Sequence, residues 1–188
     1  DCSTLSSGEL QRLRLATAMG SPLTGVMYIF DEPSAGLHPQ DNFKVIGKLS
    51  SLKDQGNSII VIEHDANNIL ASDYVIDIGP GGGAQGGSLM FSGPIDDFLK
   101  SDKSETAKAI IDSQSKNNLI TKPEISFVNK PNLIVQKADK HNVSVKDLKI
   151  PLHSLVSIVG VSGAGKSTLL HGIIADTIIN SKNHKTSW

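Results

Sequence analysis

The chain has 188 residues, a formal net charge of −1 and 38% apolar residues, which allows one domain of ordinary size or parts of two. Its single cysteine, Cys2, excludes an internal disulfide and a cysteine-rich metal site within this sequence, and it fits a reducing compartment. No apolar run approaches the ~20 residues of a membrane-spanning helix, and the first residues do not resemble a signal peptide. We therefore expect a cytoplasmic fragment with no membrane partner.

Charge is distributed unevenly along the chain. Residues 1–100 carry 6 basic and 12 acidic side chains, whereas residues 101–188 carry 12 basic and 7 acidic ones. We interpret the basic excess as a lysine-rich, solvated connector rather than a stripe for nucleic-acid binding.

Hydrophobic periodicity predicts alternating helices and strands. In the first hundred residues we expect, in order, a helix at 8–19, a strand at 26–30, a helix at 40–53, a strand at 58–62, a short helix at 66–71, and strands at 74–78 and 88–92 on either side of a glycine-rich segment. A polar connector at 101–124 with a helical patch at 106–112 follows. After it we expect strands at 133–136, 145–150 and 155–159, and a helix ending near 178. Strands that alternate with helices over short connections indicate an α/β fold, with a largely parallel sheet flanked by helices.

The most specific motif is GVSGAGKS at residues 160–167, which matches the P-loop pattern G-x-x-x-x-G-K-[ST] in full. A buried strand before it and an apolar helix after it are the context in which such a loop holds phosphate through backbone N–H groups and the helix dipole. Lys166 is expected to reach the β- and γ-phosphates of ATP, and Ser167 to bind Mg²⁺. The alternative is a glycine-rich turn with an incidental lysine. The other candidate nucleotide-binding residues of the loop are Gly160, Ser162, Gly163, Gly165 and Thr168.

A second motif is the apolar strand that ends in Asp31 and Glu32, a Walker B pattern. Asp31 suits Mg²⁺ or a metal-bound water, because a hard cation prefers oxygen ligands. Glu32 is a candidate general base for the attacking water. His64, just past the end of a second buried strand, is expected to hydrogen-bond a γ-phosphate. Asp31, Glu32 and His64 are the candidate catalytic residues, although a strand ending in Asp-Glu or a histidine in a loop is common on its own.

A third motif, LSSGE at residues 5–9, places Ser6 and Gly8 before a helix N-terminus. Small residues there leave helix N–H groups exposed to a phosphate. A simple serine N-cap explains the same pattern. The position of this motif about 20 residues before the Walker B strand favours the phosphate-binding role.

In this order, the motifs are the pattern of ATP-binding-cassette (ABC) ATPases: a signature, Walker B, the turn after it and a histidine switch. The residues within and around these motifs resemble those of the UvrA family, the ATPase component of the bacterial ABC excinuclease. The stretches that carry the resemblance are 4–14, 24–28, 31–42, 56–57, 61–65, 75–82 and 145–169. The resemblance covers most of the chain and is weakest across residues 100–132.

The resemblance implies an ATP- and Mg²⁺-dependent component of bacterial nucleotide excision repair, which binds damaged DNA as a homodimer and passes it to UvrB. Zinc is expected in the family, but its cysteine ligands are absent from this sequence. Ser7 stands where the family usually has a second glycine, and Ala35 replaces a bulkier residue. These departures leave open a UvrA-like paralogue linked to drug tolerance. A transporter-coupled ABC ATPase and a non-enzymatic interaction fragment are further alternatives.

The order of the motifs bears on domain organisation. A complete module carries its P-loop before Walker B, whereas here the P-loop follows about 130 residues later. The module is either permuted, or the chain ends one module and begins another. The polar connector and the family resemblance favour the second interpretation. We predict that residues 1–100 are the C-terminal half of a first module, 101–126 a polar linker, and 127–188 the N-terminal part of a second module.

This organisation predicts how the motifs are shared between sites. ABC sites are composite, so Ser6 and Gly8 would share a site with Lys166, whereas the Walker B acids would belong to another site. The P-loop and the Walker B strand are then not expected in one sheet. The isolated chain is expected to bind ATP weakly and to hydrolyse it negligibly, because phosphoryl transfer depends on positioning and charge stabilisation.

Overall fold

The computed structural model describes residues 13, 16–17, 23–35, 37, 39–114, 130–161 and 163–181. Its elements are β1 (Met27–Asp31), α2 (Pro39–Asp54), β2 (Ser58–Ile62), α3 (Ala66–Ala71), β3 (Tyr74–Gly79), η2 (Gly83–Gln85), β4 (Ser88–Pro94), α4 (Ile95–Phe98), α5 (Glu105–Gln114), β5 (Asn132–Lys140), β6 (Val143–Pro151), β7 (Leu155–Val159), the π-helix η3 (Thr168–Ala175) and α6 (Asp176–Ser181). The predicted strands are all present. The predicted helix at 8–19 lies almost wholly outside the described residues, and α4 was not predicted.

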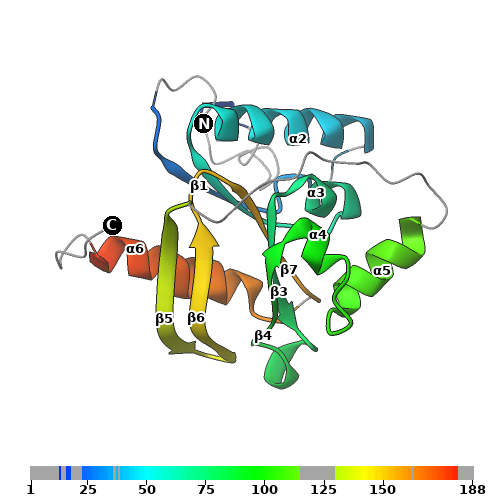
Figure 1. Ribbon diagram of the computed structural model, residues 1–188, viewed down its shortest axis with the longest axis vertical. Coiled ribbons are helices and arrows are strands. Elements are labelled where there is room, and N and C mark those ends of the chain that lie inside the picture. The colour runs from blue at the N-terminus through cyan, green and yellow to red at the C-terminus, as the bar shows by residue number, and fades with distance from the viewer. Residues whose placement is uncertain are drawn as a thin grey trace, which may run out of the picture.

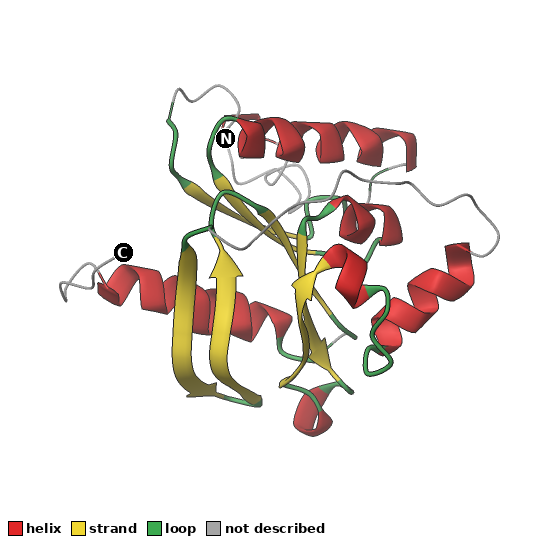
Figure 2. Cartoon of the chain, in the orientation of Figure 1, coloured by secondary structure: helices red, strands yellow, loops and turns green. Residues whose placement is uncertain are grey.

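One seven-stranded sheet organises the molecule, in the order β1-β2-β7-β3-β4-β6-β5. The first four strands of this order run parallel to one another. β4 is antiparallel to β3, and β5 and β6 form an antiparallel pair. Helices flank the sheet (Figures 1 and 2), so the predicted α/β class is confirmed.

The centre of the sheet is apolar on both faces. Every residue of β2 and β7 is buried, as expected of strands in a parallel sheet covered on both sides. Ile59 and Val61 pack with Leu49 and Leu52 of α2. Residues alternating with them on β2 pack with the helix that follows the glycine-rich loop, η3. In Figure 1, α2 and the η3–α6 segment accordingly lie on opposite sides of the sheet.

The late strand β7 lies between two early strands, β2 and β3. The prediction that the P-loop strand and the Walker B strand do not share a sheet is therefore wrong for this chain. The physical reason is that β7 is apolar on both faces and needs a partner along each edge, which β2 and β3 provide. The assignment of residues 1–100 and 127–188 to two modules stays a prediction.

Buried Asp73 holds the start of β7 in place. Its Oδ2 accepts a hydrogen bond from the backbone N–H of Leu155 at 2.9 Å, and its own N–H donates to the Leu155 carbonyl at 2.8 Å. Lys53 of α2 donates to Asp73 Oδ1 at 3.2 Å. The carboxylate thus joins β7 to the early part of the chain.

Part of the predicted polar linker is packed structure. The helical patch is confirmed as α5, where Ala107 and Ile110 are buried against Phe98 and Val75. Spacing of three residues puts both side chains on one helix face. None of the described helices is long and apolar enough to cross a membrane.

Candidate functional site

The carboxyl ends of β1, β2 and β7 meet at one edge of the sheet. Asp31 is in register with Ile62, and Ile62 is in register with Ile158. The hydrogen-bond ladder continues one residue further, because Glu32 N–H donates to the Ile62 carbonyl at 3.1 Å and Glu63 N–H to the Ile158 carbonyl at 3.2 Å. This edge is where open α/β sheets bind ligands. The Walker B acids, the His64 turn and the P-loop therefore share one edge.

The backbone shape of the P-loop requires glycine. Gly160 has φ +134°, and a Cβ placed there would lie 1.9 Å from the Ile78 carbonyl oxygen. Gly165 has φ +104°, and a Cβ there would lie 2.4 Å from Val143 Cγ2. Both conformations are open mainly to glycine, and both positions exclude a side chain. Ser162, another predicted loop residue, lies outside the described residues.

The glycine-rich segment after β3 packs against the P-loop from outside. Gly83 N–H donates to the Gly163 carbonyl at 3.0 Å, and Asn142 Nδ2 donates to the Gly83 carbonyl at 2.9 Å. A Cβ at Gly86 would lie 2.9 Å from Ala164 Cα. The P-loop is thus packed against the segment after β3, and Asn142 from the turn between β5 and β6 holds that segment in place.

The side chains of the P-loop that are predicted to face phosphate begin the helix after it. Lys166 Nζ donates to the carbonyls of Gly160 at 3.0 Å and Val161 at 3.1 Å, so its ammonium group stays at the mouth of the loop. Ser167 is exposed, and Thr168 is the first residue of η3. This arrangement suits a lysine that exchanges backbone carbonyls for phosphate oxygens.

The predicted catalytic residues lie at the ends of β1 and β2. Glu32 Oε1 is 3.6 Å from His64 Nδ1, and both side chains are exposed. Glu32 has φ 49°, a left-handed backbone that costs a non-glycine residue of order 1–3 kcal/mol and is often found at active sites. The structure therefore brings the predicted base and the predicted histidine switch together.

His171 is a neighbour of this group that no local sequence motif indicates. Its Nε2 lies 3.7 Å from Asp31 Oδ2. His171 follows Ser167 by four residues on a continuous helical segment, so both side chains leave the same side of it. The face that carries Ser167 is therefore turned toward Asp31.

The donor set fits Mg²⁺ bound chiefly through a nucleotide. Ser167 supplies a hydroxyl and Asp31 a carboxylate, and Mg²⁺ in phosphate sites takes only one or two protein ligands with substrate oxygens and water. Within the described ranges, no group of three or more His, Cys, Asp or Glu side chains could hold a metal by itself. The assignment of Ser167 and Asp31 as Mg²⁺ ligands stays a prediction. The zinc expected of the family has no ligand set among these residues.

Two buried carboxyl groups lie behind this edge. Burial raises the pKa of Glu63, against the opposing effect of hydrogen bonds from Ser34 and Asn68. Burial likewise raises the pKa of Asp77 on β3, and hydrogen bonds from Ser104 and Thr106 oppose it. Neither carboxyl was a candidate site residue, because their burial depends on packing that no local pattern shows.

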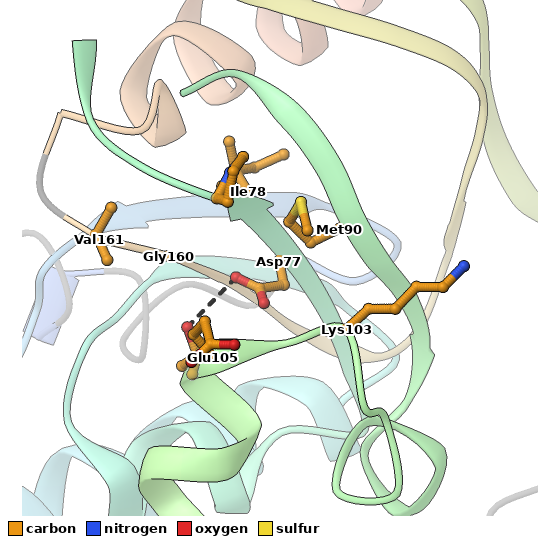
Figure 3. Close-up of a pocket in the computed structure, with 10 residues that line it drawn as sticks. Asp77, Ile78, Met90, Lys103, Glu105, Gly160 and Val161 are labelled. Carbon is orange, nitrogen blue, oxygen red and sulfur yellow. Dashed lines mark hydrogen bonds between the residues drawn. The ribbon is translucent and has the colours of Figure 1, made fainter. Parts of the chain in front are cut away.

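A pocket beside the P-loop contains Asp77. Figure 3 shows this carboxylate beside Glu105, whereas the side chain of Lys103 points away from it. A hydrogen bond from Thr106 Oγ1 to Asp77 Oδ1 measures 3.4 Å. Ser104 Oγ bonds to Asp77 Oδ2 and also accepts from the Ala107 N–H of α5. The residues that line the pocket are Asp77, Ile78, Gly79, Pro80, Met90, Lys103, Glu105, Thr106, Gly160 and Val161. The pocket therefore lies between α5 and the P-loop.

Ser6 and Gly8, the predicted signature residues, lie outside the described residues. What the structure brings together is a P-loop, a Walker B strand end and a histidine at the edge of a largely parallel sheet. This combination is typical of the fold of P-loop proteins of the ABC-ATPase class.

The chain is similar to UvrABC system protein A of Thermus thermophilus, with 44% identity over 172 residues. It is 45% identical over 183 residues to the protein of that name from Mycobacterium tuberculosis. These matches cover 92% and 96% of this chain, but only 18% of either relative's length. The crystal structure of UvrA2 from Deinococcus radiodurans matches with a TM-score of 0.56 and 37% identity, over 98% of this chain and 22% of that one. No protein-family model matches the chain.

By sequence, the chain belongs to the UvrA family, of which it spans a short segment.

Proposed function

We propose that this chain carries an ATP- and Mg²⁺-binding site of an ABC ATPase that works in bacterial nucleotide excision repair. The observation that supports the proposal is the place of β7 between β2 and β3, which puts the P-loop and the Walker B acids at one sheet edge. Electrostatics and positioning account for most of the catalysis of phosphoryl transfer, and this edge supplies both.

Each site residue has a definite role in this proposal. Backbone N–H groups of the P-loop and the ammonium group of Lys166 bind the phosphates, and Ser167 and Asp31 hold the Mg²⁺ that the nucleotide brings. Bound Mg²⁺ neutralises charge on the phosphate oxygens. Glu32 accepts the proton of the attacking water, and His64, 3.6 Å from Glu32, donates a hydrogen bond toward the terminal phosphate.

The wider function rests on the relatives. Their name, UvrABC system protein A, makes them one component of a UvrABC system, and the family resemblance of the motifs links that system to nucleotide excision repair. For the protein that contains this chain we propose binding to damaged DNA as a homodimer, cooperation with UvrB, and a cytoplasmic location. Because ABC sites are composite, we propose that a signature like that of residues 5–9 closes on this site from a neighbouring module or copy.

Binding is tested on the 188-residue chain by titration with ATP and Mg²⁺. Lys166→Ala is expected to weaken ATP affinity at least about tenfold, because a charge-assisted hydrogen bond contributes about 1.5–3 kcal/mol. Lys137→Ala, at an exposed lysine on β5, is the matched control and should leave affinity unchanged. Equal affinities for both variants would contradict the proposed phosphate site.

Turnover is tested in the longer protein that contains the chain. Glu32→Gln is expected to lower kcat by about 10²–10⁴-fold through loss of the general base. Asp97→Asn, at an exposed aspartate on α4, is the control. Stimulation of turnover by damaged DNA supports the repair function. A turnover rate that damaged DNA leaves unchanged would instead favour a transporter-coupled ATPase.

A further inference from the structure

Glu63 directly follows the end of β2 and directly precedes His64, and its side chain is fully buried. The side chain of His64 is 64% exposed at the nucleotide edge. Successive residues of an extended chain point to opposite faces, so Glu63 is directed beneath the edge that His64 faces. A buried carboxyl group is costly unless it is hydrogen-bonded, which makes its partners informative.

One partner belongs to the turn that follows the Walker B acids. Ser34 Oγ donates to Glu63 Oε2 at 2.9 Å. Within that turn, Ala35 N–H donates to the Glu32 carbonyl at 3.0 Å, and Leu37 N–H to the Ser34 carbonyl at 3.1 Å. Glu63 therefore fixes the turn that holds Glu32 in its left-handed backbone conformation.

The other partner belongs to α3. Asn68 Nδ2 donates to Glu63 Oε1 at 2.9 Å. Asp65 caps the same helix by accepting the N–H groups of Asn67 at 2.9 Å and Asn68 at 3.2 Å. His64 thus lies between Glu63, which is bonded to α3, and Asp65, which caps α3. These two anchors limit the positions that the His64 backbone can take.

From these contacts we propose that Glu63 is a positioning residue for ATP hydrolysis, which holds Glu32 and His64 at their 3.6 Å separation by bonding the Ser34 turn to α3. Glu63 does not itself touch the nucleotide. The proposal rests on the proposed function, since it assumes that Glu32 is the base and His64 a phosphate donor. A misplacement of about 1 Å in such a group can cost about 10²-fold in rate.

A role in hydrolysis differs from a role in folding alone. Loss of a mere packing contact would lower stability while leaving the kcat of the folded fraction unchanged. Loss of positioning would lower kcat while ATP affinity, which depends on the P-loop, stays the same. The two roles therefore separate in a comparison of kcat, ATP affinity and Tm.

Three variants of the longer protein that contains this chain make the comparison. Ser34→Ala removes one bond to Glu63 at a partly exposed turn. Ser92→Ala is its matched control, because it removes a side-chain hydrogen bond to Tyr74 away from the site. Glu63→Gln keeps the shape of the side chain, accepts from Asn68 through its amide oxygen and donates to Ser34 through its amide nitrogen.

We expect Ser34→Ala to lower the kcat of the folded fraction about tenfold, with ATP affinity within about twofold of the wild type. Its Tm should also fall, because one oxygen of the buried Glu63 carboxyl loses its hydrogen-bond donor. Glu63→Gln should retain most of the wild-type kcat, and Ser92→Ala all of it. Glu63→Ala should lose at least as much kcat as Ser34→Ala, measured on the folded fraction.

Either of two outcomes would overturn the positioning role: a wild-type kcat for Ser34→Ala, or a loss of activity that the fraction of unfolded protein explains in full. Glu32→Gln in the same assay separates this from a failure of the proposed function. If Glu32→Gln is inactive and Ser34→Ala is fully active, only the role of Glu63 is wrong. If Glu32→Gln keeps full turnover, the proposed function itself is wrong.

Discussion

The P-loop and the acidic strand ends lie at the same edge of one sheet but are built in different ways. The P-loop is defined by its backbone, with Gly160 and Gly165 in conformations that leave no room for a side chain. The strand ends are defined by exposed side chains, Glu32 and His64, above a buried carboxyl group, Glu63. Sequence patterns specify the first kind of site locally, whereas the second depends on tertiary packing.

The largest effect is expected where the P-loop meets β3. Gly160→Ala places a Cβ 1.9 Å from the Ile78 carbonyl oxygen, at φ +134°. We expect a loss of about 3 kcal/mol or more in the free energy of unfolding, and loss of ATP binding, from overpacking and backbone strain. Urea denaturation and ATP titration measure both.

Gly47→Ala in α2 is the control, since a Cβ there meets nothing within 4 Å. It should stabilise the chain by up to about 1 kcal/mol through higher helix propensity. A Gly160→Ala variant as stable as the wild type would show that backbone geometry does not define the loop.

The next effect tests the junction between the two parts of the chain. Asp73→Ala removes the acceptor of the Leu155 N–H and the partner of Lys53. We expect a loss of about 2–3 kcal/mol in unfolding free energy, because a hydrogen bond to a charged group contributes about 1.5–3 kcal/mol and a buried N–H is left unpaired. Asp97→Ala removes an exposed carboxylate and should cost far less. Similar losses for both variants would argue against the junction.

The two buried carboxyl groups predict a pH dependence of stability. Burial raises the pKa of Glu63 and of Asp77 in the folded chain, so the folded state holds protons that the unfolded state has released. Their contribution to stability is complete below the unfolded carboxyl pKa of about 4, and it is lost as pH rises through the folded values. Each group then lowers the unfolding free energy by at most about 1.4 kcal/mol per pH unit within that window.

Glu63→Gln and Asp77→Asn should each flatten this part of the curve of unfolding free energy against pH, measured by urea denaturation at several pH values. Glu63→Gln tests the strand ends and Asp77→Asn tests the P-loop side of the edge. An unchanged slope in both variants would mean that neither carboxyl group is buried as described.

The smallest effect is expected at an exposed ion pair behind the P-loop helix. Lys140 Nζ lies 2.8 Å from Asp176 Oδ2, with both side chains in contact with solvent. Exposed pairs contribute about 0–1 kcal/mol, so Lys140→Ala should lower the unfolding free energy by less than about 1 kcal/mol and leave ATP affinity unchanged. A larger loss, measured by urea denaturation, would show that the hairpin β5–β6 holds the helix more firmly than this pair implies.

Local patterns in the sequence were sufficient for most of the elements and for the motifs. The strands are short apolar runs bounded by turn residues, and the P-loop glycines follow from spacing within a single segment. Asp31, Glu32 and His64 became candidates through the order of the motifs along the chain. The place of β7 could not be predicted in this way, because it depends on pairing between segments almost 100 residues apart. Glu63 and His171 were missed for the same reason.

The central claim is that the early and late parts of this chain form one sheet, and a disulfide across β4 and β6 tests it most directly. Ser88 and Ser144 are exposed Cα partners on these strands. Neighbouring strands lie about 4.8 Å apart, within the Cα range of a disulfide. In a Cys2→Ser background, Ser88→Cys with Ser144→Cys should form an intramolecular disulfide under mild oxidation. Ser88→Cys with Lys146→Cys, two residues further along β6, should not. Failure of the first pair to join, or joining only between chains, would contradict the single sheet.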